Sequence, residues 1–168
     1  GELVNDIYDS GVAFADQELA KLFAALDATG ASERTVVIVT SDHGEMLGEA
    51  GGLSGHSFLD EENILVPLLI AAPGAAAPGA RIERQVGVVD VTPTALDLLG
   101  IEVPDQLDGV SLAPLVRGDK IAGPAEAWTH AGRSNHGISL RIDNRRKYLF
   151  NHEVWEPLPG RHELVDLT

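Results

Sequence analysis

The sequence has no cysteine in its 168 residues. The chain therefore forms neither disulfides nor thiolate zinc sites. Basic residues are scarce too, since 12 Lys and Arg stand against 26 Asp and Glu, for a formal net charge of −14 at pH 7. That balance argues against nucleic acid or an anionic membrane surface as a partner. No apolar run approaches the roughly 20 residues that a membrane-spanning helix needs.

The remaining composition is that of a globular protein. Hydrophobic residues make up 44% of the sequence, and the length suffices for one domain with a sizeable core. The chain begins at Gly1, without an initiator methionine or a signal peptide, so we expect a piece of a larger protein. An anionic ester would have to be drawn to so acidic a chain by a local metal field.

Residues 35–67 form the stretch around which the chain is organised. It opens with Val36–Val39, a short β-branched run that suits a strand buried on both faces, as in a parallel sheet. Asp42, His43 and Gly44 follow where the strand ends, and open α/β sheets bind ligands beyond that edge. Asp42 supplies a hard carboxylate and His43 an imidazole, while Gly44 permits a close backbone path. The alternative is a turn-capping Asp42 and a surface His43, because such tripeptides recur by chance.

Further motifs surround this tripeptide, and in chain order they read TSDHGE, LGE, GH and VPLLI. They resemble the sulfatase family of the alkaline phosphatase superfamily, whose members typically read TSDHGE-x-LGEHG, then GK-x-[ST] and VPLII. The resemblance implies that Asp42 and His43 bind a divalent metal, most often calcium, with manganese or zinc as alternatives. It also implies that His56 is a catalytic residue, in contact with the sulfate or the leaving oxygen.

Three residues depart from the family pattern, and none of them removes a metal ligand. Ala50 stands where histidine is common, Asp60 where tyrosine is usual, and Leu65 where arginine is frequent. The family's upstream acidic ligands and its Cys/Ser-x-Pro-x-Arg nucleophile motif are also missing from the sequence. We therefore expect the chain alone not to hydrolyse sulfate esters. The acidic residues 60–62 are expected on a solvated face, or else to order their loop through backbone hydrogen bonds.

Residues 1–30 are predicted to contain an amphipathic helix, because apolar residues step along it by three and four: Val12, Ala15, Leu19, Leu22 and Leu26. We expect this stripe to pack on the sheet, with Leu22 in the core. Strands are predicted at Val66–Ala71 and Val86–Val91. A helix should then start within Asp90–Thr94, with Thr92 or Asp90 as its cap, and stop at Gly100.

From residue 124 onward the pattern predicts short antiparallel strands. They are expected at residues 127–130, 138–142 and 147–151, joined by turns at 135–137 and 143–144. The segment RIDNRRKYLFN resembles a hairpin of the sulfatase family, and HELVDL resembles its ELYDL. The resemblance thus spans nearly the whole chain and implies the C-terminal portion of a sulfatase.

The expected fold is α/β, with a partial alkaline-phosphatase-like sheet, covering helices and a small C-terminal antiparallel sheet. Residues 1–123 would belong to the core, and residues 124–168 would form an incomplete subdomain. An exposed strand edge would favour self-association. The resemblance implies a fragment of a metal-dependent hydrolase acting on small-molecule or glycan sulfate esters. The alternatives are a phosphonate or phosphate-ester hydrolase of the same superfamily, and a non-catalytic binding domain that keeps the fold.

Overall fold

The computed structural model describes residues 2–49, 54–56, 59–75, 78–122, 126–131, 137–142, 146–151 and 162–166. In chain order the elements are α1 (Glu2–Ala28), η1 (Ser32–Arg34, a 3-10 turn), β1 (Val37–Thr40), β2 (Met46–Leu47), β3 (Ser54–Gly55), α2 (Glu61–Ile64), β4 (Leu68–Ala71), η2 (Val88–Asp90, a 3-10 turn), α3 (Val91–Leu98), α4 (Ala113–Val116), β5 (Glu126–Ala131), β6 (Gly137–Ile142), β7 (Arg146–Asn151) and β8 (His162–Asp166).

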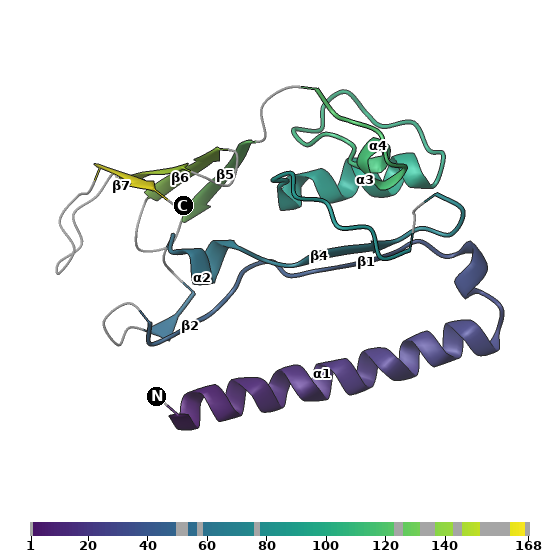
Figure 1. Cartoon of the computed structure of the whole chain (residues 1–168), viewed down its shortest axis with the longest axis horizontal. Helices are drawn as coiled ribbons and strands as arrows, with labels where there is room; N and C mark the ends of the chain where they lie inside the picture. The colour runs from purple at the N-terminus through teal and green to yellow at the C-terminus, as the bar shows by residue number, and fades with distance from the viewer. Residues whose placement is uncertain are drawn as a thin grey trace.

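The fold is mixed α/β, and β1 and β4 run through its middle (Figure 1). In that view α1 lies on one side of the two strands, and α3 and α4 lie on the other. The C-terminal sheet, β5 to β8, lies beyond one end of the pair. Among the described residues, no helix combines the length and the apolar character needed to cross a bilayer.

β1 forms where the β-branched run predicts a strand, one residue later than expected. Its described partner β4 runs antiparallel, with Val37 opposite Ala71 and Thr40 opposite Leu68. The expected parallel pairing is therefore wrong for this pair, because a short apolar run indicates a strand without fixing the direction of its neighbour. Burial on both faces is also wrong, since β1 is half-buried and Thr40 is exposed. Self-association through a strand edge stays a prediction.

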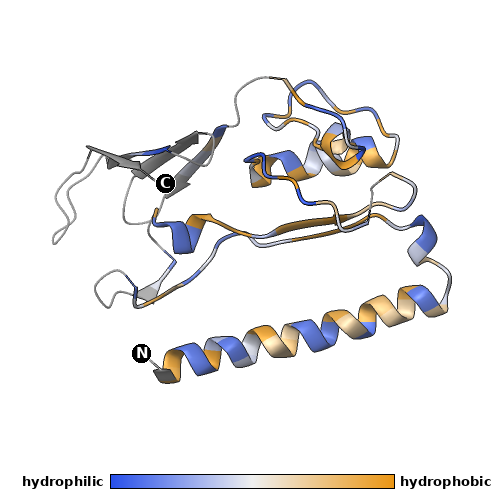
Figure 2. Cartoon of the chain, in the orientation of Figure 1, coloured by the Kyte–Doolittle hydropathy of each residue, from blue (hydrophilic) through white to orange (hydrophobic). Residues whose placement is uncertain are grey.

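α1 has the predicted amphipathic pattern, and apolar residues recur along it in Figure 2. The expected packing of this stripe on the sheet is wrong. Leu22 is 54% exposed and Phe14 is 64% exposed, while Leu19 and Leu26 are half-buried. Helical periodicity identifies which residues share a face, but it does not show whether that face is covered.

The strand predicted at Val86–Val91 is absent from these described residues, which form an extended approach, then η2 and the start of α3. Asp90 is the cause, because its Oδ2 accepts the Gly87 N–H at 2.9 Å and turns the backbone. Its side chain does not cap α3 as expected. Instead, Oδ1 accepts the Val110 N–H at 2.9 Å, across 20 residues of sequence.

Thr94, in α3, adds further hydrogen bonds between these segments. Its hydroxyl donates to the Asp90 carbonyl at 2.6 Å and accepts the Leu112 N–H at 2.8 Å, and the residue has no exposed surface. A side chain at Gly109 would overlap the Val89 carbonyl oxygen, so glycine is required for this close approach. Hence the loop before α4 is held against η2 and α3 by buried hydrogen bonds, which cost stability when broken.

The C-terminal sheet has four antiparallel strands in the order β5-β6-β7-β8. Three of them confirm the predicted strands to within one or two residues, and β8 was not predicted as a strand. The predicted turns fall largely outside the described residues, as does the position of Ala50. A domain boundary near residue 123 stays a prediction.

We expect Leu22→Ala to change the free energy of unfolding by no more than about 0.5 kcal/mol, because the side chain is more than half exposed. The matched substitution Leu112→Ala should cost roughly 2–5 kcal/mol, because Leu112 is 4% exposed. Urea titration of both variants measures the difference. A loss in Leu22→Ala as large as that in Leu112→Ala would contradict the exposed position of α1.

A second expectation concerns acid stability. The Ser111 hydroxyl, 2.5 Å from Asp97 Oδ2, and the Arg117 guanidinium lower the pKa of Asp97 in the folded protein. The carboxylate therefore contributes stability above its unfolded pKa, which is about 3.9, and this contribution is lost as the pH falls further. Asp97→Asn should lower the free energy of unfolding near neutral pH, and its difference from wild type should shrink as the pH falls below the unfolded value of about 3.9. Glu18→Gln, in an exposed pair with Lys21, is the control. A pH-independent difference for Asp97→Asn would refute the assignment.

Candidate functional site

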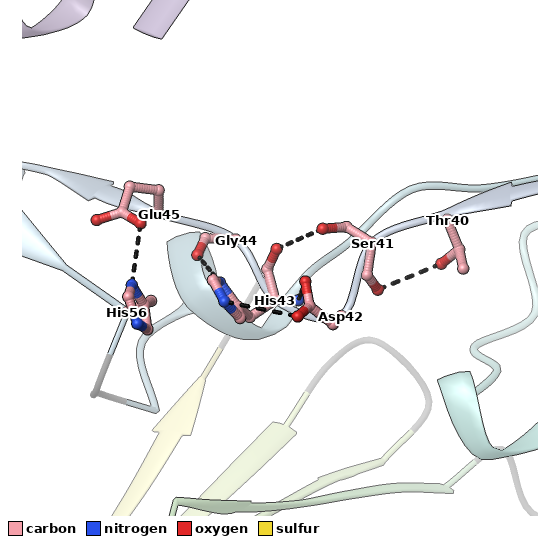
Figure 3. Close-up of polar contacts among 7 residues, drawn as sticks. All are labelled: Thr40, Ser41, Asp42, His43, Gly44, Glu45 and His56. Carbon is pink, nitrogen blue, oxygen red and sulfur yellow. Dashed lines mark hydrogen bonds and ion pairs between the residues drawn. The ribbon is translucent and has the colours of Figure 1, made fainter. Parts of the chain in front are cut away.

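Asp42 and His43 lie directly beyond the carboxyl end of β1 (Figure 3). The Ser41 hydroxyl donates to the His43 carbonyl at 2.6 Å, and Asp42 Oδ1 accepts the His43 backbone N–H at 3.0 Å. These local bonds shape the turn that ends the strand. The Asp42 side chain is 87% exposed, and its Oδ2 lies 3.8 Å from His43 Nε2.

The backbone around His43 fixes which ring nitrogen is available. His43 Nδ1 lies 2.8 Å from the Gly44 carbonyl oxygen, as Figure 3 shows. A carbonyl only accepts hydrogen bonds, so Nδ1 is the donor in this contact, and in the neutral ring Nε2 keeps its lone pair. Nε2 is the nitrogen nearer to Asp42, and a hydrogen bond from the other ring nitrogen to a backbone carbonyl is typical of metal-binding histidines.

His56 reaches the same place from another segment. The small ladder of β2 and β3 pairs Met46 with Gly55, which brings the flanking residues Glu45 and His56 side by side. His56 Nδ1 lies 3.2 Å from Glu45 Oε2, so the carboxylate orients this ring (Figure 3). The His56 ring stacks on the His43 ring, with centroids 4.3 Å apart and an angle of 17° between the planes.

Two donor sets for a cation lie in this region. Asp42 Oδ2 and His43 Nε2 are close enough for one ion to bind both, since metal–ligand bonds span about 2.0–2.6 Å. His43, Glu45 and His56 also offer ligand atoms that all lie within 4.8 Å of one another. An imidazole binds an ion in the plane of its ring, however, and the stacked rings have nearly parallel planes. As arranged, His43 and His56 do not converge on one ion, so the geometry favours Asp42 with His43.

A cavity of about 800 Å³ opens beside these side chains and is lined by Asp42, His43 and His56. Its volume is within the usual range for small-molecule sites, about 300–1,000 Å³. Further lining residues come from the segments 84–90 and 108–112 and from β5, including Arg84 and Trp128. The structure thus brings together all three residues that the sequence singled out.

Several contributors were missed by sequence reasoning. Glu45 lies within the TSDHGE motif but was given no role, and Arg84 has no motif that could have identified it. The sequence predicts that Glu61 lies on a solvated face or orders its loop through backbone hydrogen bonds. Its carboxylate pairs instead with the buried Lys147, at 3.1 Å. Leu65, one of the departures from the family pattern, also lines the cavity and is 62% exposed.

Comparison with known proteins adds independent findings. A family model described as Sulfatase matches residues 4–101. Choline-sulfatase from Rhizobium meliloti is 40% identical over 147 residues, covering 85% of this chain and 28% of that protein. Arylsulfatase K from Xenopus laevis is 34% identical over 152 residues, covering 84% of this chain and 28% of that protein.

Solved structures are similar as well. The structure of a protein described as a sulfatase, from Bacteroides thetaiotaomicron, matches with a TM-score of 0.75 at 28% identity, over 90% of this chain and 33% of that one. A phosphonate monoester hydrolase from Silicibacter pomeroyi matches with a TM-score of 0.73 at 28% identity, over 90% of this chain and 32% of that one. The chain therefore spans about a third or less of the relatives that it matches.

Gly44→Ala tests how tightly the site turn is packed. A Cβ at this position would overlap the Glu62 carbonyl oxygen, which belongs to the backbone of α2. We expect a loss of about 1–3 kcal/mol in the free energy of unfolding, because the two backbones must separate. The control is Gly11→Ala on α1, where an added Cβ meets no atom within 4 Å. That variant should gain roughly 0.5–1 kcal/mol of helix stability. Equal urea midpoints for Gly44→Ala and wild type would contradict the close approach.

Proposed function

Because this chain belongs to the sulfatase family of the alkaline phosphatase superfamily, we propose that it carries part of the metal centre of a sulfate-ester hydrolase. The observation that supports this proposal is the meeting of Asp42, His43 and His56 at one cavity. Asp42 and His43 would bind a divalent cation of the kind that the family typically uses. His56 would contact the sulfate group or the leaving oxygen.

The donor set suits a divalent cation but completes no cage for calcium. Asp42 offers a hard oxygen and His43 a nitrogen, whereas calcium takes six to eight oxygen ligands. Manganese and zinc are the alternatives, because imidazole suits transition metals better than it suits calcium. We nevertheless propose calcium, the ion most often bound in the family, with the remaining oxygens supplied from outside this pair. Affinity of the 168-residue chain alone should therefore be weak.

Each side chain has a defined task in this proposal. A bound divalent cation would polarise the ester and stabilise charge that develops on the transferring group. The Gly44 carbonyl keeps the His43 Nε2 lone pair free, and Asp42 adds negative charge beside it. Glu45 orients His56, which in its doubly protonated form can also donate from Nε2 to an ester oxygen.

We further propose that the chain corresponds to the C-terminal portion of such an enzyme, with residues 1–123 in its core and 124–168 in a smaller subdomain. The sequence has no cysteine that could become the family's formylglycine nucleophile. The chain would then act only together with a nucleophile from elsewhere. Choline-sulfatase and an N-acetylglucosamine-6-O-sulfatase are among its relatives, which supports a small-molecule or glycan sulfate ester as the substrate.

A phosphonate or phosphate-ester hydrolase is the second candidate. Structures of two phosphonate monoester hydrolases match this chain, with TM-scores of 0.73 and 0.72. The two chemistries differ in charge, because a sulfate ester carries one negative charge and a phosphate monoester up to two. A non-catalytic binding domain is the third candidate, and the intact Asp42–His43 pair argues against it.

The direct test is calorimetric titration of the chain with calcium, manganese and zinc. We expect weak binding of at least one ion, and a loss of that binding in Asp42→Ala and in His43→Ala, because each removes one of two donors. Asp16→Ala, which removes an exposed aspartate of α1, is the matched control and should bind as wild type does. Glu45→Gln should also keep its affinity. If Glu45→Gln loses binding and Asp42→Ala keeps it, the ion belongs to the other donor set and the proposal is wrong.

An aryl sulfate assay under the same conditions tests the fragment hypothesis. We expect no turnover with or without metal. Metal-dependent turnover that persists in His56→Ala and disappears in Asp42→Ala would show a self-sufficient site, and the proposed division of the enzyme would fail. Titration of the metal-loaded chain with sulfate and with methylphosphonate separates the first two candidates by the anion that binds more tightly.

A further inference from the structure

Lys147 is a charged residue in the interior of the protein. It lies on β7, between β6 and β8, and is 3% exposed. Its neighbours Arg146 and Tyr148 are exposed, so the alternation of the strand turns the lysine inward. Lysine is almost never buried completely unless it is paired.

The partner of Lys147 is Glu61, which is 86 residues earlier in the chain. Lys147 Nζ donates to Glu61 Oε1 at 3.1 Å, and the two side chains are 4% and 30% exposed. Removing one member of such a pair leaves the other charge uncompensated in a poorly solvated place, which is strongly unfavourable. This ion pair is therefore a specific link between the C-terminal sheet and α2.

From α2 the contacts continue to the candidate site. The Asn63 carbonyl, also in α2, accepts the Gly44 N–H at 2.7 Å. The Gly44 carbonyl in turn accepts from His43 Nδ1 at 2.8 Å, which is the contact drawn in Figure 3. Three polar contacts, joined through the backbone of α2 and of Gly44, thus connect the Lys147 ammonium to the His43 imidazole.

We propose that Lys147 is a positioning residue, which acts through Glu61 and α2 to hold Gly44 and the His43 ring in place. It needs no contact with substrate or metal for this task. The role of the His43 ring in cation binding rests on the proposed function, whereas the position of the ring is a property of the fold. The cation affinity of the site is the functional quantity that should respond.

Amide hydrogen exchange of the 168-residue chain tests the local effect. In Lys147→Met the Gly44 amide should exchange about tenfold faster than in wild type, because α2 is no longer held and opens locally. The Leu112 amide, which is bonded to Thr94 in another part of the molecule, should exchange at its wild-type rate. Global destabilisation would accelerate both amides alike.

Three further variants keep the test decisive. Glu61→Gln removes the ion pair but leaves an amide oxygen that can accept a hydrogen bond from the buried Lys147 ammonium, so it gives the answer even if Lys147→Met does not fold. The double variant should exchange no faster at Gly44 than either single variant, because both act through one interaction. Lys21→Met breaks an exposed ion pair with Glu18 and should leave the Gly44 amide unchanged. Unchanged exchange at Gly44 in Glu61→Gln, or equal acceleration at Gly44 and Leu112, would overturn the proposal.

Calcium and manganese titrations separate this inference from the proposed function. We expect Glu61→Gln to lower the cation affinity by about tenfold, as loss of an outer-shell partner typically does. If wild type binds no divalent cation, the proposed function fails, and the exchange experiment still decides the role of Lys147. If Asp42-dependent binding is present and Glu61→Gln changes neither exchange nor affinity, only the role of Lys147 is refuted.

Discussion

One backbone hydrogen bond, from the Gly44 N–H to the Asn63 carbonyl at 2.7 Å, determines where the candidate site lies. It joins the turn after β1 to α2, and the missing side chain at Gly44 lets the two backbones approach. The Gly44 carbonyl then holds the His43 ring, and the ladder of β2 and β3 brings His56 against it. These segments are too short to be stable alone. The site therefore depends on contacts between segments rather than on any single element.

A second group of buried hydrogen bonds fixes another part of the cavity wall. Asp90 and Thr94 accept the backbone N–H groups of Val110 and Leu112, and all of these residues except Val110 are buried. Apolar contacts alone would tolerate several positions of that loop, since they have little directionality. Buried donors and acceptors do not, because an unmade bond costs about 1–3 kcal/mol. Polar contacts between distant segments thus hold two parts of the cavity wall, the turn at Asp42 and His43 and the segments 84–90 and 108–112.

Local sequence patterns predict the helices and strands better than the contacts between them. The strand at Val37, the helix that stops before Gly100 and the C-terminal hairpins each follow from local patterns, and the structure has them. The direction of β4 and the exposure of Leu22 depend on distant segments, which local patterns do not report. Lys147 was hidden for the same reason. In the run Arg-Lys-Tyr, composition alone would bury the tyrosine, and only the partner on α2 explains why the lysine is inside.

The acidity of the chain opposes the chemistry of the proposed site. A net charge of −14 repels an anionic ester at long range. Inside the cavity, however, the field is set by the groups that line it, because salt screens exposed charges beyond about 8 Å. Arg84 lines it, but so do Asp90, Asp108, Glu126 and the strongly exposed Asp42. A cation bound at Asp42 would reverse the sign of that contribution. On the proposed function, the ion is thus an electrostatic condition for capturing the anion as well as a participant in the chemistry.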